Sequence, residues 1–88
     1  MAKYTYKEFV ADRDKVLVII GHSLEYLGCD QNTYRVTVGD PVLKVFCDVY
    51  LSKRTLVIRT GKRQPRYFRK QTWEQVSKIL KNIFNYLA

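Results

Sequence analysis

The sequence predicts a single α+β domain in which an N-terminal and a C-terminal helix pack on one face of a three-stranded antiparallel meander, in the order α-β-β-β-α. Two observations carry this prediction. Apolar residues recur at three- and four-residue spacing near both ends of the chain, and they alternate with polar residues in the middle. The 88 residues are also the length of one small domain. All elements must therefore share one core.

The first helix is expected over roughly residues 5–27. Thr5-x-x-Glu8 has the form of a capping box at its start, and Gly28 fits a C-cap at its end. The competing interpretation is a strand at 15–20, which is a run rich in β-branched residues. The helical spacing of apolar residues continues past Gly21, and this favours the helix.

Three strands are expected where the period changes to two, with turns near 39–41 and 52–54. One face of the strands is apolar throughout and comprises Tyr34, Val36, Val38, Leu43, Val45, Cys47, Val49, Leu51, Leu56 and Ile58. The other face, which has no helix to cover it, carries Arg35, Thr37, Lys44, Phe46, Asp48, Tyr50, Thr55, Val57 and Arg59.

The last helix is expected to begin at Thr72, where Gln75 completes a second capping box. Its apolar positions form the most regular helical stripe in the chain: Trp73, Val76, Ile79, Leu80, Ile83, Phe84 and Leu87. The polar segment before it leaves room for a short extra strand at Arg66–Arg69.

Several classes of protein are not expected. The longest apolar run, Val16–Ile20, is far too short to span a membrane. His22 is the only histidine, no phosphate-binding or dinucleotide-binding loop is present, and Cys29 and Cys47 lack the spacing of metal ligands. We therefore expect no catalytic residues, no metal and no cofactor. The N-terminus does not have the pattern of a secretory signal, so we expect two reduced, half-buried thiols and an intracellular location.

The positive charge is concentrated in the C-terminal part of the chain. Residues 1–52 contain six basic and seven acidic residues, a net charge of −1, whereas residues 53–88 contain ten basic residues and one acidic residue, a net charge of +9. Eight of those ten basic residues lie between Lys53 and Lys70, where no acidic residue occurs. A surface kept only for solubility mixes the two signs, so this block indicates a binding role.

We expect this basic block to contact phosphates of a nucleic acid, in a small non-catalytic protein that is accessory to a larger complex. The candidate residues are Lys53, Arg54, Arg59, Lys62, Arg63, Arg66, Tyr67, Arg69 and Lys70. The pattern does not distinguish DNA from RNA. The alternative is an adaptor or inhibitor whose basic edge docks on an acidic protein surface. On the open sheet face, Arg35, Phe46 and Tyr50 are candidates for base stacking or for a homodimer contact.

Overall fold

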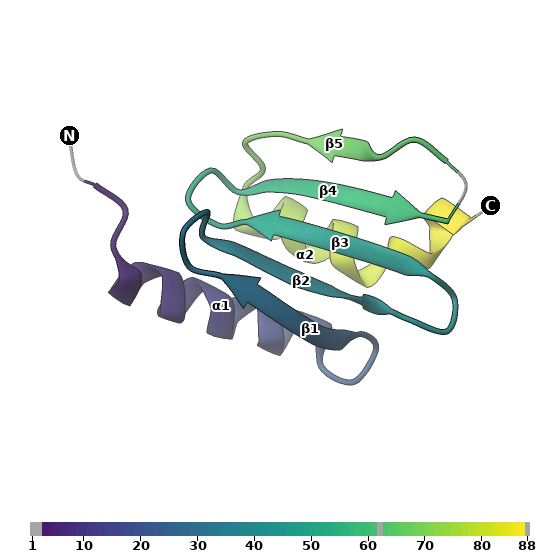
Figure 1. The fold of residues 1–88 in the computed structure, drawn as a ribbon, viewed down its shortest axis with the longest axis horizontal. Coiled ribbons are helices and arrows are strands. Elements are labelled where there is room, and N and C mark those ends of the chain that lie inside the picture. Colours follow the sequence, from purple (N-terminus) through teal and green to yellow (C-terminus); the bar gives the residue numbers. More distant parts are fainter. Residues whose placement is uncertain (1–2, 62, 88) are drawn as a thin grey trace.

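The structure is a computed structural model that describes residues 3–61 and 63–87. Its elements are, in chain order, α1 (Tyr6–Ile20), β1 (Glu25–Asp30), β2 (Arg35–Asp40), β3 (Val45–Tyr50), β4 (Thr55–Thr60), β5 (Arg66–Phe68), α2 (Trp73–Lys81) and a short 3₁₀ helix, η1 (Ile83–Leu87). Within the described residues, the strands form one sheet in the order β1-β2-β3-β4-β5, and each strand is antiparallel to its neighbours (Figure 1).

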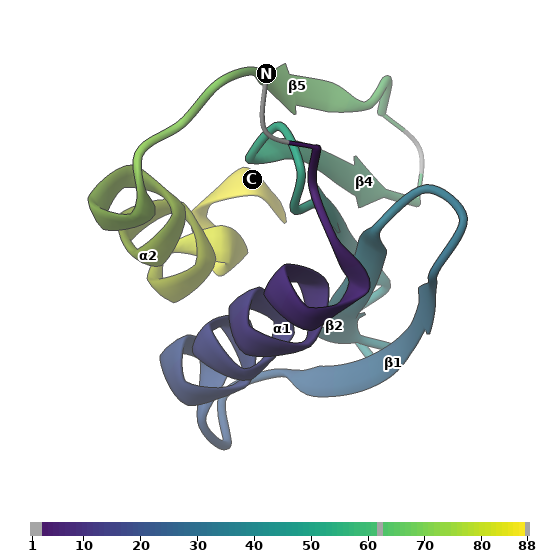
Figure 2. The same cartoon turned by 90° about the vertical axis from the view of Figure 1, so that its left-hand side faces the viewer.

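The predicted class, α+β, is confirmed, but the predicted number of strands is wrong. The sheet has five strands rather than three. The additional strands are β1, whose first three residues fall in the segment predicted to be helical, and β5, where the sequence left room for a short strand. Both helices lie on the same side of the sheet, as Figure 2 shows. The opposite side of the sheet is therefore an open face, which no helix within residues 3–61 and 63–87 covers.

The first helix is shorter than predicted, and the reason is Gly21. This residue adopts φ +51°, in the left-handed region that favours glycine, and its N–H donates to the carbonyl oxygen of Leu17 at 3.1 Å. The helix therefore ends at Ile20, and the predicted C-cap at Gly28 is wrong. The competing prediction of a strand at 15–20 is wrong too, because this run is the last part of α1.

Strands β1 to β4 repeat with a period of ten residues. Each of these strands has six residues, and a four-residue turn joins each one to the next. The last residue of each turn has a left-handed backbone, with φ of 53° at Tyr34, 56° at Lys44 and 48° at Arg54. The three turns thus end in the same backbone conformation, although none of these positions is a glycine.

The second strand of the predicted meander begins later than expected. Leu43 and Lys44 lie in the β2–β3 turn rather than in a strand. The cause is Asp40, whose Oδ1 accepts hydrogen bonds from the N–H groups of Val42 and Leu43, at 2.9 and 3.1 Å. Leu43 is consequently 52% exposed and takes no part in the core to which the alternation assigned it.

The start of the last helix is as predicted. The Thr72 hydroxyl accepts a hydrogen bond from the Gln75 N–H at 3.2 Å, and Gln75 Oε1 accepts one from the Thr72 N–H at 2.8 Å. This reciprocal pair is the capping box. The helix ends at Lys81, and the apolar stripe continues into η1, where Ile83 is fully buried.

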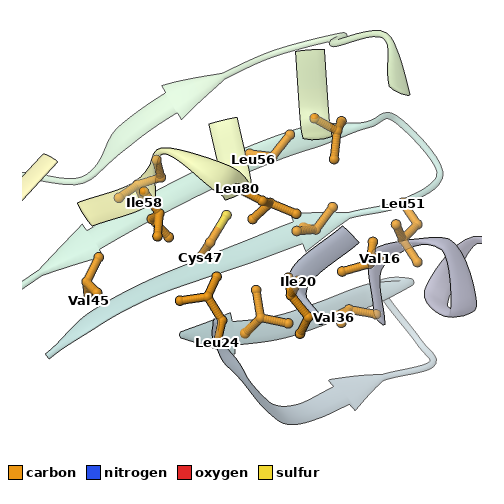
Figure 3. Close-up of a cluster of buried hydrophobic side chains, with 14 of the residues drawn as sticks. Val16, Ile20, Leu24, Val36, Val45, Cys47, Leu51, Leu56, Ile58 and Leu80 are labelled. Atoms are coloured by element: carbon orange, nitrogen blue, oxygen red, sulfur yellow. The ribbon is translucent and has the colours of Figure 1, made fainter. Parts of the chain in front are cut away.

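The core lies between the sheet and the two helices (Figure 3). Its largest fully buried side chains are Phe9, Leu51, Leu56, Ile58, Leu80, Ile83, Val16, Val36, Val38, Val45, Val49 and Val76. Of the two free thiols, Cys29 is exposed and Cys47 is buried, so neither is half-buried as expected. Burial, and to a lesser extent the charge of Asp48, raises the pKa of the Cys47 thiol well above its usual range.

Candidate binding site on the open sheet face

The open face contains a hollow with a volume of about 1000 Å³. Its lining comes from β3, β4, β5 and the segments that flank them: Thr33, Asp48, Tyr50, Ser52, Lys53, Thr55, Val57, Arg59, Pro65, Tyr67, Arg69 and Lys70. Cross-strand pairing places Tyr67 beside Val57, and Val57 beside Asp48, so these three side chains share one face of the sheet. The hollow therefore lies on the side away from the helices.

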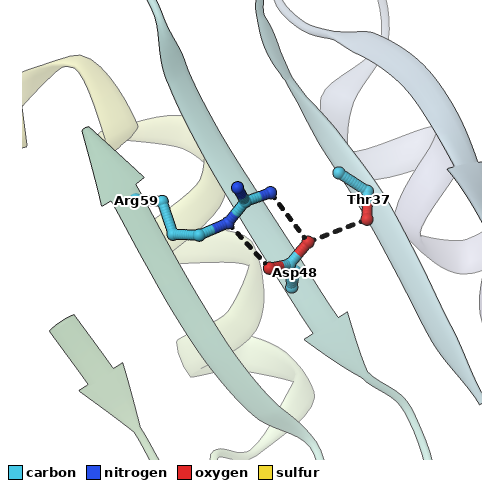
Figure 4. Close-up of polar contacts among 3 residues, drawn as sticks. All are labelled: Thr37, Asp48 and Arg59. Carbon is cyan, nitrogen blue, oxygen red and sulfur yellow. Dashed lines mark hydrogen bonds and ion pairs between the residues drawn. The ribbon is translucent and has the colours of Figure 1, made fainter. Parts of the chain in front are cut away.

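Asp48 is a buried carboxylate, 8% exposed, in the lining of the hollow. Its Oδ2 accepts a hydrogen bond from Arg59 Nε at 2.9 Å, and its Oδ1 accepts one from an Arg59 terminal nitrogen at 3.3 Å and one from the Thr37 hydroxyl at 2.8 Å (Figure 4). The network joins β2, β3 and β4. It compensates the burial of the carboxylate and holds the Arg59 side chain in one orientation.

Phe46 is half-buried and packs against residues of both neighbouring strands. The guanidinium of Arg59 lies 5.4 Å from the centre of the Phe46 ring. On the other side, Phe46 is paired with Gly39, where a side chain would collide with the backbone of β3. Phe46, Arg59 and Asp48 thus form one fixed group on the open face.

The predicted basic block is brought together only in part. The hollow gathers Lys53, Arg59, Tyr67, Arg69 and Lys70 from the predicted set of contact residues, and Tyr50 from the predicted stacking residues. Four of these six residues are basic, and among the described residues Asp48 is the one acidic residue in the lining, so these residues have a net charge of +3. The guanidinium of Arg69 also lies 5.9 Å from the centre of the Tyr67 ring.

The other predicted residues lie elsewhere. Arg66 is paired with Ile58, a core residue, and its guanidinium lies 5.4 Å from the centre of the Tyr86 ring in η1, so it extends over the helix side of the sheet. Arg63 is exposed outside the lining, and Lys62 lies outside the described residues. The expectation that the whole block forms one edge is therefore corrected for Arg66.

Arg54 and Arg35 also lie outside the lining of the hollow. The Nε of Arg54 donates to the carbonyl oxygen of Gln71 at 2.8 Å, and the Gln71 N–H donates back to the Arg54 carbonyl at 3.0 Å. This pair ties the β3–β4 turn, which contains Lys53, to the segment after β5, which contains Arg69 and Lys70. Arg35 is paired with Tyr50 on the open face, next to the hollow.

The sequence pattern did not indicate that Asp48 and Val57 belong to the candidate site. The two-residue alternation had already assigned both to the open face, so a signal for their position existed. Nothing in the alternation showed that segment 65–70 would lie beside them, because that depends on the pairing of β5 with β4.

The chemistry of the lining suits an anionic ligand with flat, apolar groups. Lysine and arginine contact phosphates, and tyrosine rings stack on bases. We found no match to this chain among protein families, curated proteins or solved structures. None of the helices within residues 3–61 and 63–87 is long and apolar enough to cross a bilayer.

Proposed function

We propose that this protein binds nucleic acid in the hollow of its open sheet face. One observation carries the proposal: four basic side chains and two tyrosines converge on one hollow, on the side of the sheet that the helices leave uncovered. Phosphates and bases are the groups that such a mixture of side chains recognises.

The basic side chains in the hollow differ in whether an acidic side chain is paired with them. Arg59 is paired with Asp48, which offsets part of its charge. Within the described part of the chain, Lys53, Arg69 and Lys70 have no carboxylate within ion-pair distance. We therefore assign the phosphate contacts mainly to these three residues, and to Arg59 a structural role with a weaker contact.

The same charges argue against the open face as a homodimer contact. Two copies that pair face to face would bring together two hollows of net charge +3. Like charges that oppose each other across an interface disfavour association. A nucleic acid, which carries a negative charge on every phosphate, fits this face better than a second copy does.

The test is a binding series over single- and double-stranded DNA and RNA at several salt concentrations. We expect Lys53→Ala/Arg69→Ala to weaken binding and to reduce the salt slope by roughly 0.7–0.9 for each phosphate that the variant no longer neutralises. The matched control is Lys78→Ala/Lys81→Ala, which removes two exposed charges from α2. Equal weakening in both double variants would show attraction by net charge alone and would overturn the assignment to the hollow.

A second pair of variants tests the assignment within the basic segment itself. Arg69 lines the hollow, whereas Arg66 lies over Tyr86 on the helix side. We expect Arg69→Ala to weaken binding severalfold more than Arg66→Ala. Absence of binding to all four nucleic acids at low salt would reject the proposal and leave an acidic protein surface as the partner to test.

A further inference from the structure

The charged residues of the hollow lie in two places along the strands, the ion pair in one and the unpaired basic residues in the other. The ion pair between Asp48 and Arg59 lies within β3 and β4, whereas Lys53 is in the β3–β4 turn, and Arg69 and Lys70 follow β5. The Arg54–Gln71 contacts bring the turn and the segment after β5 together. The unpaired basic groups thus gather at one end of the hollow.

The region beside this basic end is lined by aromatic and apolar side chains and by the Asp48–Arg59 ion pair. Tyr50 and Tyr67 both line the hollow, together with Val57. Tyr67 is 59% exposed, although it belongs to a residue type that tends to be at least partly buried. The third aromatic residue of the open face, Phe46, does not line the hollow. Tyr50 and Tyr67 are therefore the aromatic side chains on which a ligand in the hollow can stack, and the Arg69 guanidinium lies 5.9 Å from the centre of the Tyr67 ring.

The carboxylate of Asp48 limits what can lie in this region. A phosphate placed against it would meet a negative charge, even though Arg59 and Thr37 engage its oxygens. A base carries no such charge, and it has flat faces that stack on tyrosine. The hollow thus favours a phosphate at its basic end and a base along its strands.

We infer that the ligand of the hollow is single-stranded nucleic acid, with an unpaired base seated against Tyr50 and Tyr67 and its backbone phosphate at Lys53, Arg69 and Lys70. The inference rests on the proposed function and narrows it. A base within a duplex is stacked and paired on both strands, so it cannot enter a hollow in a sheet face without leaving the helix. The duplex should therefore use only the phosphate contacts.

The test compares one oligonucleotide as a single strand and as a duplex, in DNA and in RNA form. Tyr50→Leu and Tyr67→Leu should each reduce single-strand affinity about tenfold, because each removes a stacking surface. Tyr50→Phe and Tyr67→Phe should restore most of it, and the salt slope should stay unchanged in all four variants. Duplex affinity should change little. Tyr6→Leu, an exposed tyrosine on α1, is the matched control.

Fluorescence of Trp73, the only tryptophan, checks that each variant is folded. A measurement on the unaltered chain supports the test if a leucine variant does not fold: ultraviolet crosslinking to a single strand, with the crosslinked peptides mapped by mass spectrometry. Crosslinks at Tyr50 or Tyr67 support the inference. Crosslinks only at other residues overturn it.

The outcomes separate this inference from the proposed function. Binding that is equal for single strand and duplex, and insensitive to both leucine variants, would overturn the seated base while leaving phosphate binding in the hollow intact. Absence of binding to any nucleic acid would remove both.

Discussion

The two faces of the sheet are built from the same strands and differ in almost every property. Along β3, the residues Val45, Cys47 and Val49 are fully buried under the helices. The residues between them, Phe46, Asp48 and Tyr50, face the open side, where polar contacts and a hollow replace close packing. Core packing and the proposed binding surface thus use alternate residues of one strand, so substitution of an exposed residue of the open face should affect stability much less than substitution of a core residue.

The largest expected effect lies on the helix-covered face. Leu80 is 1% exposed, and Leu80→Ala should lower the free energy of unfolding by about 2–5 kcal/mol, through reduced burial and the cavity left behind. Ile79 is only half-buried, so Ile79→Ala should lower the free energy of unfolding by less. Urea unfolding, monitored by the fluorescence of Trp73, measures the free energy of unfolding of both variants.

On the open face, Tyr67→Ala is the variant to compare with Leu80→Ala. It should change the free energy of unfolding by no more than about 0.5 kcal/mol, because Tyr67 is largely exposed. If the two variants proved equally destabilising, the two faces would not be separable in the way the alternation implies.

The second prediction tests how closely the open face is packed at one point. Alanine at Gly39 would place its Cβ against the carbonyl oxygen of Val45 and 2.9 Å from the Cα of Phe46. Both are backbone atoms that cannot move aside cheaply, so Gly39→Ala should cost about 1–3 kcal/mol. Gly61→Ala is the control, since no atom lies within 4 Å of the position its Cβ would take. Equal stabilities would mean that β2 and β3 adjust freely at this pair.

The third prediction concerns the polar network. Asp48→Asn keeps the shape of the side chain but removes the charge that Arg59 contacts. Because the Arg59 side chain is about half exposed, water compensates part of the lost ion pair. We expect a loss of about 1–2 kcal/mol. Asp14→Asn removes a carboxylate that is 63% exposed and 3.6 Å from Arg13, and it should have almost no effect. Denaturant unfolding at neutral pH distinguishes the two, and equal destabilisation would contradict a special role for Asp48.

The alternation of residues predicted both faces of β3 and β4, because it depends on local sequence alone. The capping box at Thr72 was predicted for the same reason. The end of α1 was not, since leucines at helical spacing follow Gly21 and only its backbone conformation shows that the helix stops there.

The set of residues that line the hollow could not be predicted from the local sequence either. Whether Arg66 or Tyr67 faces the open side depends on how β5 pairs with β4, and a shift of one residue would exchange them. The closure of its basic end depends on Arg54 meeting Gln71, a contact between residues 17 positions apart in the chain. Charge density alone predicted a basic edge, and tertiary pairing divided it between two faces.

The smallest expected effect lies in the turns that join the strands of the sheet to each other. Lys44 ends its turn with φ 56°, a conformation that costs a side-chain-bearing residue about 1–2 kcal/mol and glycine almost nothing. Because glycine also loses more entropy on folding, Lys44→Gly should stabilise the protein by a net of roughly 0.5–1 kcal/mol. Arg54 has nearly the same backbone, with φ 48°, but its side chain also binds the Gln71 carbonyl. Arg54→Gly should therefore gain less or lose stability, and it should also weaken nucleic-acid binding, because it loosens the basic end of the hollow. Thermal unfolding and the single-strand binding assay measure both effects. A stabilisation of Arg54→Gly equal to that of Lys44→Gly, with binding unchanged, would show that the Arg54–Gln71 contact does not shape the hollow.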